Sequence, residues 1–509
     1  MTVLEASDDL GGVWHCNRYP GARCDVESYD YSYMFSPELE QDWRWSERYA
    51  TQPEVLRYAH HVAERFDLGR DIEFNTRISH AMFDEHGERW TVSSDDGREW
   101  SAQYLILAVG QLSTTKRSLI PGRDEFRGAI YHSAEWPHDP ISFAGKRVGI
   151  IGTGSSGVQM TPVIAGQAEH VTVFQRSANF SIPAANAPIS DDEDRAVKAG
   201  YRERRQKALH SPSGLGFVPN GASALDAAPE ERQAVYEAAW NRLGFGFALA
   251  YKDILLDQAS NDTPADFVRA KIAKQVEDPA TRARLTPQGF PFGTKRPSAD
   301  SNYFATFNRA NVSLVDIKAN PIEAITPDGL RTRDAAYPLD IIILATGFDA
   351  FSGSLLRPEI SGRGGVKLSE KWASGPLTSL GLAVVGFPNM FVIVGPGSSP
   401  SLLSNVILSI EQQVDWLSAL LHHVRENDVT TIETTLAAEN DWVEHVNARA
   451  QETLYPKAAS YYMGAEIDGK PKVFMPYSGG VRDYRRILEK VAADGYSGFT
   501  LTKGSVDAA

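Results

Sequence analysis

The sequence predicts an α/β protein with two Rossmann-like dinucleotide-binding domains and a helical insert. Residues 90–110 and 322–347 repeat one plan, in which two strands joined by an Asp-Gly turn precede an apolar strand that ends in Ala-x-Gly. Residues 146–176 contain a strand, a Gly-x-Gly-x-x-Gly turn, a helix-compatible stretch and a second strand. Residues 186–295 show helical periodicity. The apolar strand of each repeat is expected to be parallel and buried on both faces.

The glycine-rich turn predicts a pyrophosphate-binding site. Gly152 permits a tight turn, Gly154 lets a pyrophosphate approach the backbone, and Gly157 lets the helix pack on the strand. Arg176 and Ser177 follow the next strand at the place where an NAD-binding protein carries an acid. A cation and a hydroxyl there suit a 2′-phosphate, which favours NADP(H). The predicted contacts of the turn and the helix start are Gly152, Thr153, Gly154, Ser155, Ser156, Gly157, Val158 and Gln159.

The first repeat begins differently from the second. Thr2, Val3 and Leu4 read as a short strand that ends at Glu5, and an acid at the end of a second Rossmann strand is typical of a ribose ligand. No glycine turn precedes this strand in the sequence. Compared with the second repeat, about 25–35 residues for a strand, a turn and a helix are absent. We therefore expect the first Rossmann-like domain to be N-terminally incomplete.

Composition limits the classes of partner. A chain of 509 residues with a net charge of −14 argues against nucleic acid and against an anionic membrane surface. Cys16 and Cys24 are the only cysteines and fit no zinc-ligand spacing, so no metal is predicted. No apolar run reaches about 18 residues, and no charged-then-apolar leader stands at the N-terminus. A cytoplasmic protein is expected, and the oligomeric state stays open.

Three long motifs together carry a family resemblance. They are "GGVWHCNRYPGARCD" at 11–25, "FRGAIYHSAEWP" at 126–137 and "KRPSADSNYFATFNR" at 295–309. The middle motif has the form F-x-G-x-x-x-H-x-x-x-W-P and resembles the fingerprint of Baeyer–Villiger monooxygenases, the class B flavoprotein monooxygenases. The first resembles that family's second signature. The resemblance extends over nearly the whole chain and is strongest to the cyclohexanone, phenylacetone and steroid monooxygenase branch.

This resemblance implies FAD and NADP(H) as cofactors and a small-molecule ketone and O₂ as substrates. In that family NADPH reduces the flavin, a C4a-peroxyflavin forms with O₂, and the ketone becomes an ester or lactone. Such chemistry needs a fixed positive charge beside the reacting oxygens, which arginine supplies because it stays protonated. By resemblance Arg296 carries this catalytic role, and Asp25 orients it through an ion pair. Lys295 matches a residue that holds the 2′-phosphate together with Arg176 and Ser177.

The remaining site residues follow from the same resemblance. Arg23 and Cys24 match positions on the nicotinamide side, and Cys24 is interpreted as a small packing residue rather than a redox thiol. The residues that match FAD-contacting positions are Glu5, Gly12, Val13, Trp14, Asp25, Tyr31, Ile78 and Val406.

The motifs also imply how the chain divides between the two cofactors. We expect two FAD-binding parts, two NADP-binding parts and one helical insert. The FAD-binding parts are 1–125 and 351–509, the NADP-binding parts are 126–185 and 296–350, and the insert is 186–295.

Three other functions remain as alternatives. An N- or S-oxygenating flavin monooxygenase needs no such arginine, and its fingerprint differs at Trp136 and Pro137. A pyridine nucleotide–disulfide reductase needs a CxxxxC pair, which this sequence does not contain. An inactive NADP-binding pseudoenzyme that has lost flavin would follow from the absent first turn, because the pyrophosphate would lose backbone N–H donors. The sequence does not distinguish cyclic, aryl and linear ketones.

Overall fold

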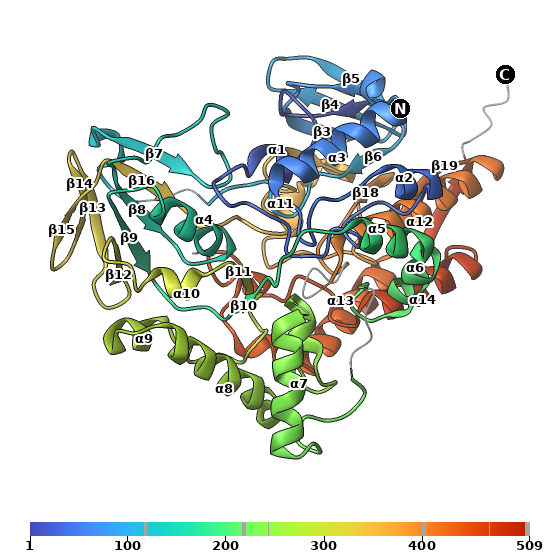
Figure 1. The fold of residues 1–509 in the computed structure, drawn as a ribbon. Coiled ribbons are helices and arrows are strands. Elements are labelled where there is room, and N and C mark those ends of the chain that lie inside the picture. The colour runs from blue at the N-terminus through green and yellow to red at the C-terminus, as the bar shows by residue number, and fades with distance from the viewer. Residues whose placement is uncertain (117–119, 216–219, 243, 399–403, 468, 504–509) are drawn as a thin grey trace, which may run out of the picture.

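A five-stranded parallel sheet forms the centre of the nucleotide domain with the glycine turn (Figure 1). The computed structural model describes residues 1–116, 120–215, 220–242, 244–398, 404–467 and 469–503. The strand order of the sheet is β12-β9-β8-β16-β7, and every neighbouring pair is parallel. Its strands are β7 (Ala129–His132), β8 (Arg147–Ile151), β9 (His170–Gln175), β12 (Val312–Asp316) and β16 (Ile341–Leu344). Helix α4 (Ser155–Ala165) begins directly after Gly154, the second glycine of the turn, and contains the third, so the predicted helix follows the first strand of the motif.

Both sequence repeats form the predicted meander of antiparallel strands. The second repeat gives the sheet β13 (Ile322–Thr326), β14 (Gly329–Thr332) and β15 (Ala336–Pro338). The first gives β3 (Ile78–Asp84), β4 (Arg89–Ser94) and β5 (Glu99–Ala102), which β17 (Glu359–Ser361) extends by parallel pairing with β3. The Asp-Gly turns therefore mark hairpins in both halves of the molecule, and the predicted α/β fold class is confirmed.

The two apolar strands that end the repeats differ in burial. Strand β16 is buried at all four residues, as expected for a parallel strand covered on both faces. Strand β6 (Leu105–Leu107) is not, because Ile106 is 39% exposed, and the expectation of full burial is wrong there. The described residues give β6 one strand neighbour, β18 (Met390–Val392), whereas β16 lies between two. A separate parallel pair joins β1 (Val3–Leu4) to β2 (Ile72–Glu73).

A helical insert lies between β10 (Ser181–Pro183) and β11 (Ser298–Asp300), which pair in parallel and close its base. In Figure 1, α7, α8 and α9 lie together below the five-stranded sheet, while α5 and α6 lie near α14. The helical periodicity predicted for 186–295 is interrupted after α7 (Pro229–Arg242), since a 3₁₀ helix begins at Gly244. The insert contains α5 (Asp191–Ala199), α6 (Tyr201–His210), α7 (Pro229–Arg242), η3 (Gly244–Leu249), α8 (Gln258–Gln275) and α9 (Pro279–Leu285).

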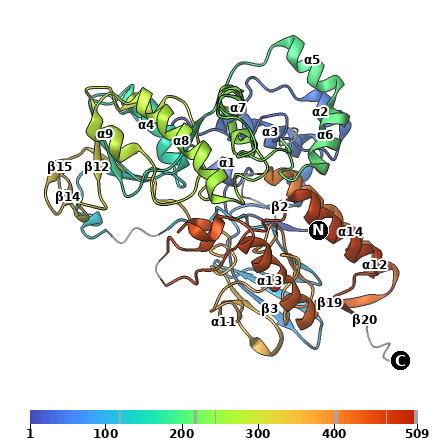
Figure 2. The same ribbon diagram turned by 90° about the horizontal axis from the view of Figure 1, so that it is seen from below.

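The start and the end of the chain build the other half of the molecule together. In the view from below, β3, α11 and α13 all appear on one side of the molecule, away from the five-stranded sheet (Figure 2). The helices of this half are α1 (Val13–Cys16), α2 (Pro37–Asp42), α3 (Gln52–Arg65), α11 (Leu368–Lys371), α12 (Val406–Glu426), α13 (Leu436–Gln451) and α14 (Val481–Ala493). Strands β19 (Val429–Thr434) and β20 (Phe499–Lys503) form an antiparallel pair at its edge. Short helices complete the chain, namely η1 (Leu68–Asp71), η2 (Arg123–Glu125), α10 (Tyr303–Thr306), η4 (Arg363–Gly365), η5 (Tyr455–Lys457) and η6 (Tyr461–Met463).

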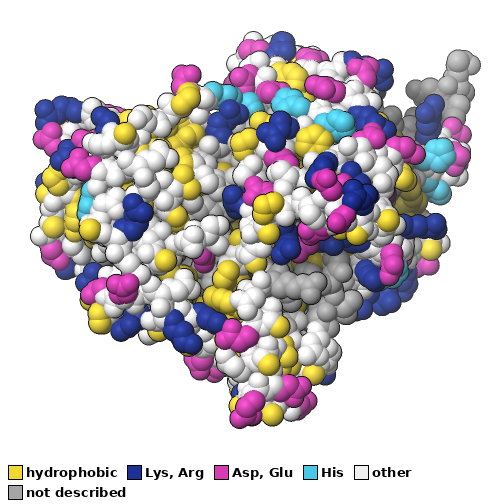
Figure 3. Space-filling model, in the orientation of Figure 1, with side chains coloured by type: hydrophobic (Ala, Val, Ile, Leu, Met, Phe, Trp, Pro, Cys, Tyr) yellow, Lys and Arg dark blue, Asp and Glu magenta, His cyan; other side chains and the backbone are white. Residues whose placement is uncertain are grey.

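The surface mixes charges of both signs. On the face shown in Figure 3, Lys and Arg side chains are interspersed with Asp and Glu, despite the net charge of −14. Among the described helices, none has both the length and the apolar composition that crossing a membrane requires.

Candidate active site

Arg296 and Asp25 form a bidentate ion pair between segments 271 residues apart in the sequence. Arg296 Nε donates to Asp25 Oδ2 at 2.9 Å and Nη2 donates to Oδ1 at 2.9 Å. The two side chains are only 17% and 26% exposed. Burial alone would lower the pKa of Arg296, but the Asp25 carboxylate outweighs it and holds this pKa above its usual value. The site therefore contains a permanent positive charge whose orientation is fixed by two parallel hydrogen bonds.

Two buried tyrosines, Tyr455 and Tyr462, and the partly buried Tyr461 lie around this arginine, and no local pattern in the sequence reveals them. The rings of Tyr461 and Tyr462 lie with centroids 4.3 Å apart, and Tyr455 packs edge-on against Tyr462 at 5.8 Å. Burial raises the pKa of each phenol, and the charge of Arg296 opposes that rise. The phenols are therefore neutral, and their rings shield the guanidinium from water. No local spacing links "SYYMG" to Arg296, because more than 160 residues separate them.

The three glycines of the nucleotide turn have distinct surroundings. A Cβ on Gly152, whose φ is +115°, would lie 2.3 Å from the carbonyl oxygen of Ala345. A Cβ on Gly157 would lie 2.2 Å from the carbonyl oxygen of Gly152. A Cβ on Gly154 would meet nothing within 4 Å, although this residue caps the N-terminus of α4. The first and third glycines thus allow close packing, and the second faces open space that fits an approaching pyrophosphate.

The other residues predicted for the nicotinamide nucleotide lie around this turn. Thr153 Oγ1 donates to the carbonyl of Ser177 at 3.1 Å, which ties the turn to the end of β9. Ser155 Oγ lies 3.5 Å from Ser298 Oγ in β11. Ser156 is the second residue of α4, and Val158 is buried in the core beneath it. The glycine turn therefore contacts the chain directly after β9, and the start of α4 lies beside β11.

Arg176 and Lys295, the two cations predicted to hold a 2′-phosphate, lie on separate segments and influence each other electrostatically. Arg176 directly follows β9, and Lys295 Nζ lies 4.9 Å from the centre of the Phe290 ring. Burial lowers the pKa of Lys295, Arg176 lowers it further, and Glu466 raises it. Arg176 and Lys295 therefore lie close enough to repel each other, as expected of two groups that share one anionic ligand.

Gln159 joins α4 to the segment that ends at Asp25. Its Oε1 accepts a hydrogen bond from Tyr19 OH at 2.9 Å and one from the backbone N–H of Arg23 at 3.4 Å. Its Nε2 donates to the carbonyl of Arg23 at 3.1 Å. A Cβ on Gly21 would lie only 2.7 Å from the carbonyl of Gln159, so the two backbones are in close contact. Gln159 thus connects the two halves of the site.

Several residues predicted to contact the flavin cluster beside Asp25. Trp14 Nε1 donates to Tyr31 OH at 2.9 Å, and both rings pack on the core that contains Cys24. Cys24 is 3% exposed, and burial raises the pKa of its thiol, which supports its interpretation as a packing residue. Arg23 Nη1 donates to Glu47 at 3.3 Å rather than to a site residue.

The remaining predicted flavin contacts lie on separate elements. Glu5 follows β1, and its Oε1 accepts a hydrogen bond from the N–H of Ser7 at 2.7 Å. Ile78 begins β3, and Val406 begins α12. A Cβ on Gly12 would meet nothing within 4 Å, and Val13 beside it is 39% exposed. This open backbone at the start of α1 fits the edge of a flavin cofactor, so the residues present are compatible with FAD.

Asp8, His15 and His138 form a cluster that the sequence spacing did not reveal. One ligand-type atom of each lies within 4.8 Å of the others. His15 Nε2 lies 2.9 Å from Asp8 Oδ1, and Arg18 donates to the Nδ1 atoms of His138 and His15 at 3.0 and 3.3 Å. Asp8 and Arg18 thus already occupy both ring nitrogens of His15, and Arg18 one of His138, so the cluster is satisfied by hydrogen bonds.

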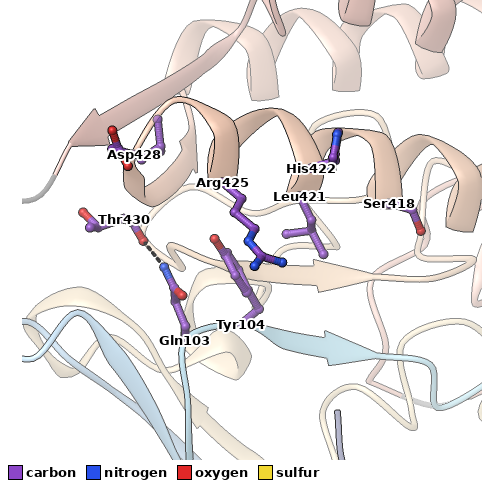
Figure 4. Close-up of a pocket in the computed structure, with 9 residues that line it drawn as sticks. Gln103, Tyr104, Ser418, Leu421, His422, Arg425, Asp428 and Thr430 are labelled. Atoms are coloured by element: carbon purple, nitrogen blue, oxygen red, sulfur yellow. Dashed lines mark hydrogen bonds between the residues drawn. The ribbon is translucent and has the colours of Figure 1, made fainter.

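A pocket of about 730 Å³ lies between α12, β19 and the chain before β6 (Figure 4). Gln103 Nε2 donates across it to the carbonyl of Thr430 at 3.2 Å. None of the predicted site residues lines it. The lining residues are Gln103, Tyr104, Ser418, Leu421, His422, Arg425, Asp428, Val429 and Thr430.

A buried carboxylate attaches α12 to the segment after Tyr31. Glu411 Oε1 accepts hydrogen bonds from the N–H groups of Met34 and Phe35 at 2.8 and 3.1 Å, while Oε2 is buried without a hydrogen-bond partner. Burial raises the pKa of Glu411 to about 7. The folded protein thus holds this proton more tightly than the unfolded chain does, so the associated stability is fully present below pH 4.5 and is lost as the pH rises from there through about 7.

Glu411→Gln should remove this part of the pH dependence. We expect the variant to melt at a higher temperature than the wild type at pH 8 and at nearly the same temperature at pH 5, because glutamine stays neutral. Thermal unfolding followed by circular dichroism from pH 5 to pH 8 measures the difference. Glu426→Gln, at the exposed end of the same helix, is the control. Parallel curves for the Glu411→Gln variant and the wild type would contradict the assignment.

Comparison with known proteins identifies the family. Residues 1–184 match the family model described as flavin-binding monooxygenase-like. A Baeyer–Villiger monooxygenase from Pseudooceanicola batsensis is 41% identical over 497 residues, which cover 97% of this chain and 90% of that protein. A phenazine N-monooxygenase from Lysobacter antibioticus is 41% identical over 505 residues, which cover 98% and 92%.

A solved structure extends this similarity to the whole fold. An oxidised steroid monooxygenase bound to NADP superimposes with a TM-score of 0.95 at 51% identity, covering 99% of this chain and 95% of that one. The resemblance drawn from the three motifs is thereby confirmed. The chain belongs to the flavin-binding monooxygenases and, within them, to the Baeyer–Villiger monooxygenases.

Proposed function

We propose that this chain uses FAD, NADPH and O₂ to convert a ketone into an ester or lactone, with Arg296 and Asp25 at the reacting centre. The observation that carries the proposal is the buried, bidentate ion pair between them. FAD, when bound, supplies the centre that NADPH reduces and that activates O₂. The contribution of the protein is to bind, orient and stabilise charge around that centre.

Arg296 is suited to stabilise negative charge on the oxygen of the attacked carbonyl. Its pKa lies above the usual arginine value, so it cannot act as a proton donor and remains a fixed cation. Asp25 restricts the guanidinium to one orientation, and the surrounding tyrosine rings reduce competition from water. A pre-oriented charge in a partly dehydrated site is worth more to a transition state than the same charge in water.

The nucleotide site supports NADPH as the reductant. Arg176, Ser177 and Lys295 lie at the end of β9 and before β11, on the carboxyl side of the five-stranded sheet. We assign 126–185 and 296–350 to this nucleotide domain, because β7, β8, β9, β12 and β16 share that sheet. We assign 1–125 and 351–509 to FAD on the pairing of β6 with β18 and of β3 with β17.

Oxygenation at nitrogen is the second candidate, because one relative of 41% identity is a phenazine N-monooxygenase. Ketone oxygenation is better supported, since attack on a carbonyl develops an oxyanion and attack on a basic nitrogen does not. A buried arginine held by a carboxylate serves the first reaction.

A substrate panel tests the proposal. Purified protein supplied with FAD should be yellow and should consume NADPH and O₂ faster when a ketone is added, with a product 16 mass units heavier than the ketone. Cyclic, aryl-alkyl and linear ketones are compared by mass spectrometry, and a nitrogen heteroaromatic serves as the competing substrate. Failure to retain flavin would support the pseudoenzyme alternative. Flavin retention with N-oxide as the only product would favour N-oxygenation.

A further inference from the structure

A carboxylate lies among the cations assigned to the 2′-phosphate. Glu466 follows η6, and its Oε2 accepts a hydrogen bond from Lys116 Nζ at 2.8 Å. The Glu466 and Lys116 side chains are 25% and 16% exposed. Burial alone would raise the pKa of Glu466, but Lys116, Lys295 and Arg176 together lower it. The cluster therefore combines three positive charges with one ionised carboxylate.

The backbone holds both members of this ion pair in place. Lys116 lies between β6 and β7, and its N–H donates to the carbonyl of Gly347 at 3.2 Å. The segment that carries Glu466 is attached to the same region again, because Lys470 Nζ donates to the carbonyl of Ala350 at 2.9 Å. Lys116 is thus positioned by its own backbone, and Lys470, which follows Glu466 closely in the sequence, is bonded to the same region.

We propose that Glu466 is an internal competitor of the 2′-phosphate and that Lys116 is a third cation of the phosphate site. This inference rests on the proposed use of NADPH. A phosphate monoester carries nearly two negative charges and would compete with the Glu466 carboxylate for Lys116. A nucleotide with a 2′-phosphate must therefore share Lys116 with Glu466 or displace it. Glu466 lowers the affinity for such nucleotides and leaves nucleotides without that phosphate unaffected.

Isothermal titration calorimetry with two probes tests this assignment without relying on turnover. Adenosine 2′,5′-bisphosphate carries the 2′-phosphate, and 5′-AMP does not. Glu466→Gln should bind the bisphosphate about three- to tenfold more tightly than the wild type does and should bind 5′-AMP equally well, because Lys116 is released from its ion pair with Glu466 and can pair with the 2′-phosphate. Lys116→Gln should weaken bisphosphate binding by a similar factor. In the Lys116→Gln background, the gain from Glu466→Gln should shrink, since the two act through one ion pair.

Two further variants separate this role from a structural one. Glu466→Asp keeps the charge and should bind the bisphosphate more weakly than Glu466→Gln does. Glu452→Gln removes an equal charge at a site that is 57% exposed and paired with Arg449, and should change neither affinity. If Glu466→Gln weakens the binding of both probes equally, Glu466 has a structural role instead. If neither affinity changes, Glu466 does not affect nucleotide binding. Either result overturns this inference but leaves the NADPH assignment intact. A wild type that binds both probes equally would overturn the NADPH assignment as well.

Discussion

Arg296→Ala should lower ester formation by at least about 1,000-fold while NADPH still reduces the flavin in the loaded protein. Loss of one charge-stabilising donor typically costs 100- to 1,000-fold in kcat, and here the whole fixed charge is removed. The variant also leaves the Asp25 carboxylate, 26% exposed, without its bidentate partner. Reduction of the flavin does not require charge stabilisation on a ketone oxygen, so it should survive.

Stopped-flow absorbance of the flavin and mass spectrometry of the products measure the two steps separately. Arg296→Lys is the matched control, because lysine keeps the charge but replaces the planar fork with a single ammonium group. We expect this variant to fall between alanine and the wild type. Ester formation at the wild-type rate in Arg296→Ala would show that the role assigned to Arg296 is wrong, and loss of both steps would indicate a failure to bind flavin.

Gly157→Val should abolish NADP⁺ binding by displacing the start of α4. Its Cβ would lie 2.2 Å from the carbonyl oxygen of Gly152. Because this oxygen belongs to the backbone of the turn, the overlap can be relieved only by a change in the conformation of the turn. Relieving such an overlap typically costs about 1–3 kcal/mol, and a contact with fixed backbone lies at the upper end of that range. Thermal unfolding should therefore show a destabilised protein, and NADP⁺ titration should show no saturation.

Gly154→Ala is the matched variant that distinguishes a loss of protein stability from a loss of nucleotide affinity. The added methyl group would meet nothing within 4 Å among the residues that the structure describes, so the melting temperature should stay close to that of the wild type. NADP⁺ affinity should nevertheless fall, since this backbone is where the pyrophosphate is expected to approach. Wild-type affinity in both variants would place the nucleotide elsewhere.

The sequence predicted those features whose determinants lie within a short stretch of chain. The glycine turn at 152–157 encodes its own strand, turn and helix, and each Asp-Gly hairpin is specified by its two flanking strands. The pairing of Arg296 with Asp25 depended on family resemblance, because nothing in either local pattern specifies a partner 271 residues away.

Contacts made by docking of distant segments could not be predicted. Tyr462 and Glu466 reach the site only because the chain after α13 folds back onto it, and no periodicity encodes that return. The exposure of Ile106 has the same origin, since the burial of a strand is decided by its neighbours in space rather than by its own apolar residues.

Gln159 has a consequence for exchanging parts between related enzymes. Its amide matches three groups on Tyr19 and Arg23, so helix α4 and the stretch that ends at Asp25 form one interlocking unit. A chimaera that received its nucleotide domain from a related enzyme would contain a foreign α4, and that helix would pack against residues 19–25 of the host, to which its side chains are not matched. Residues 19–25 therefore have to be transferred together with the nucleotide domain, even though more than 100 residues separate them from α4 along the chain.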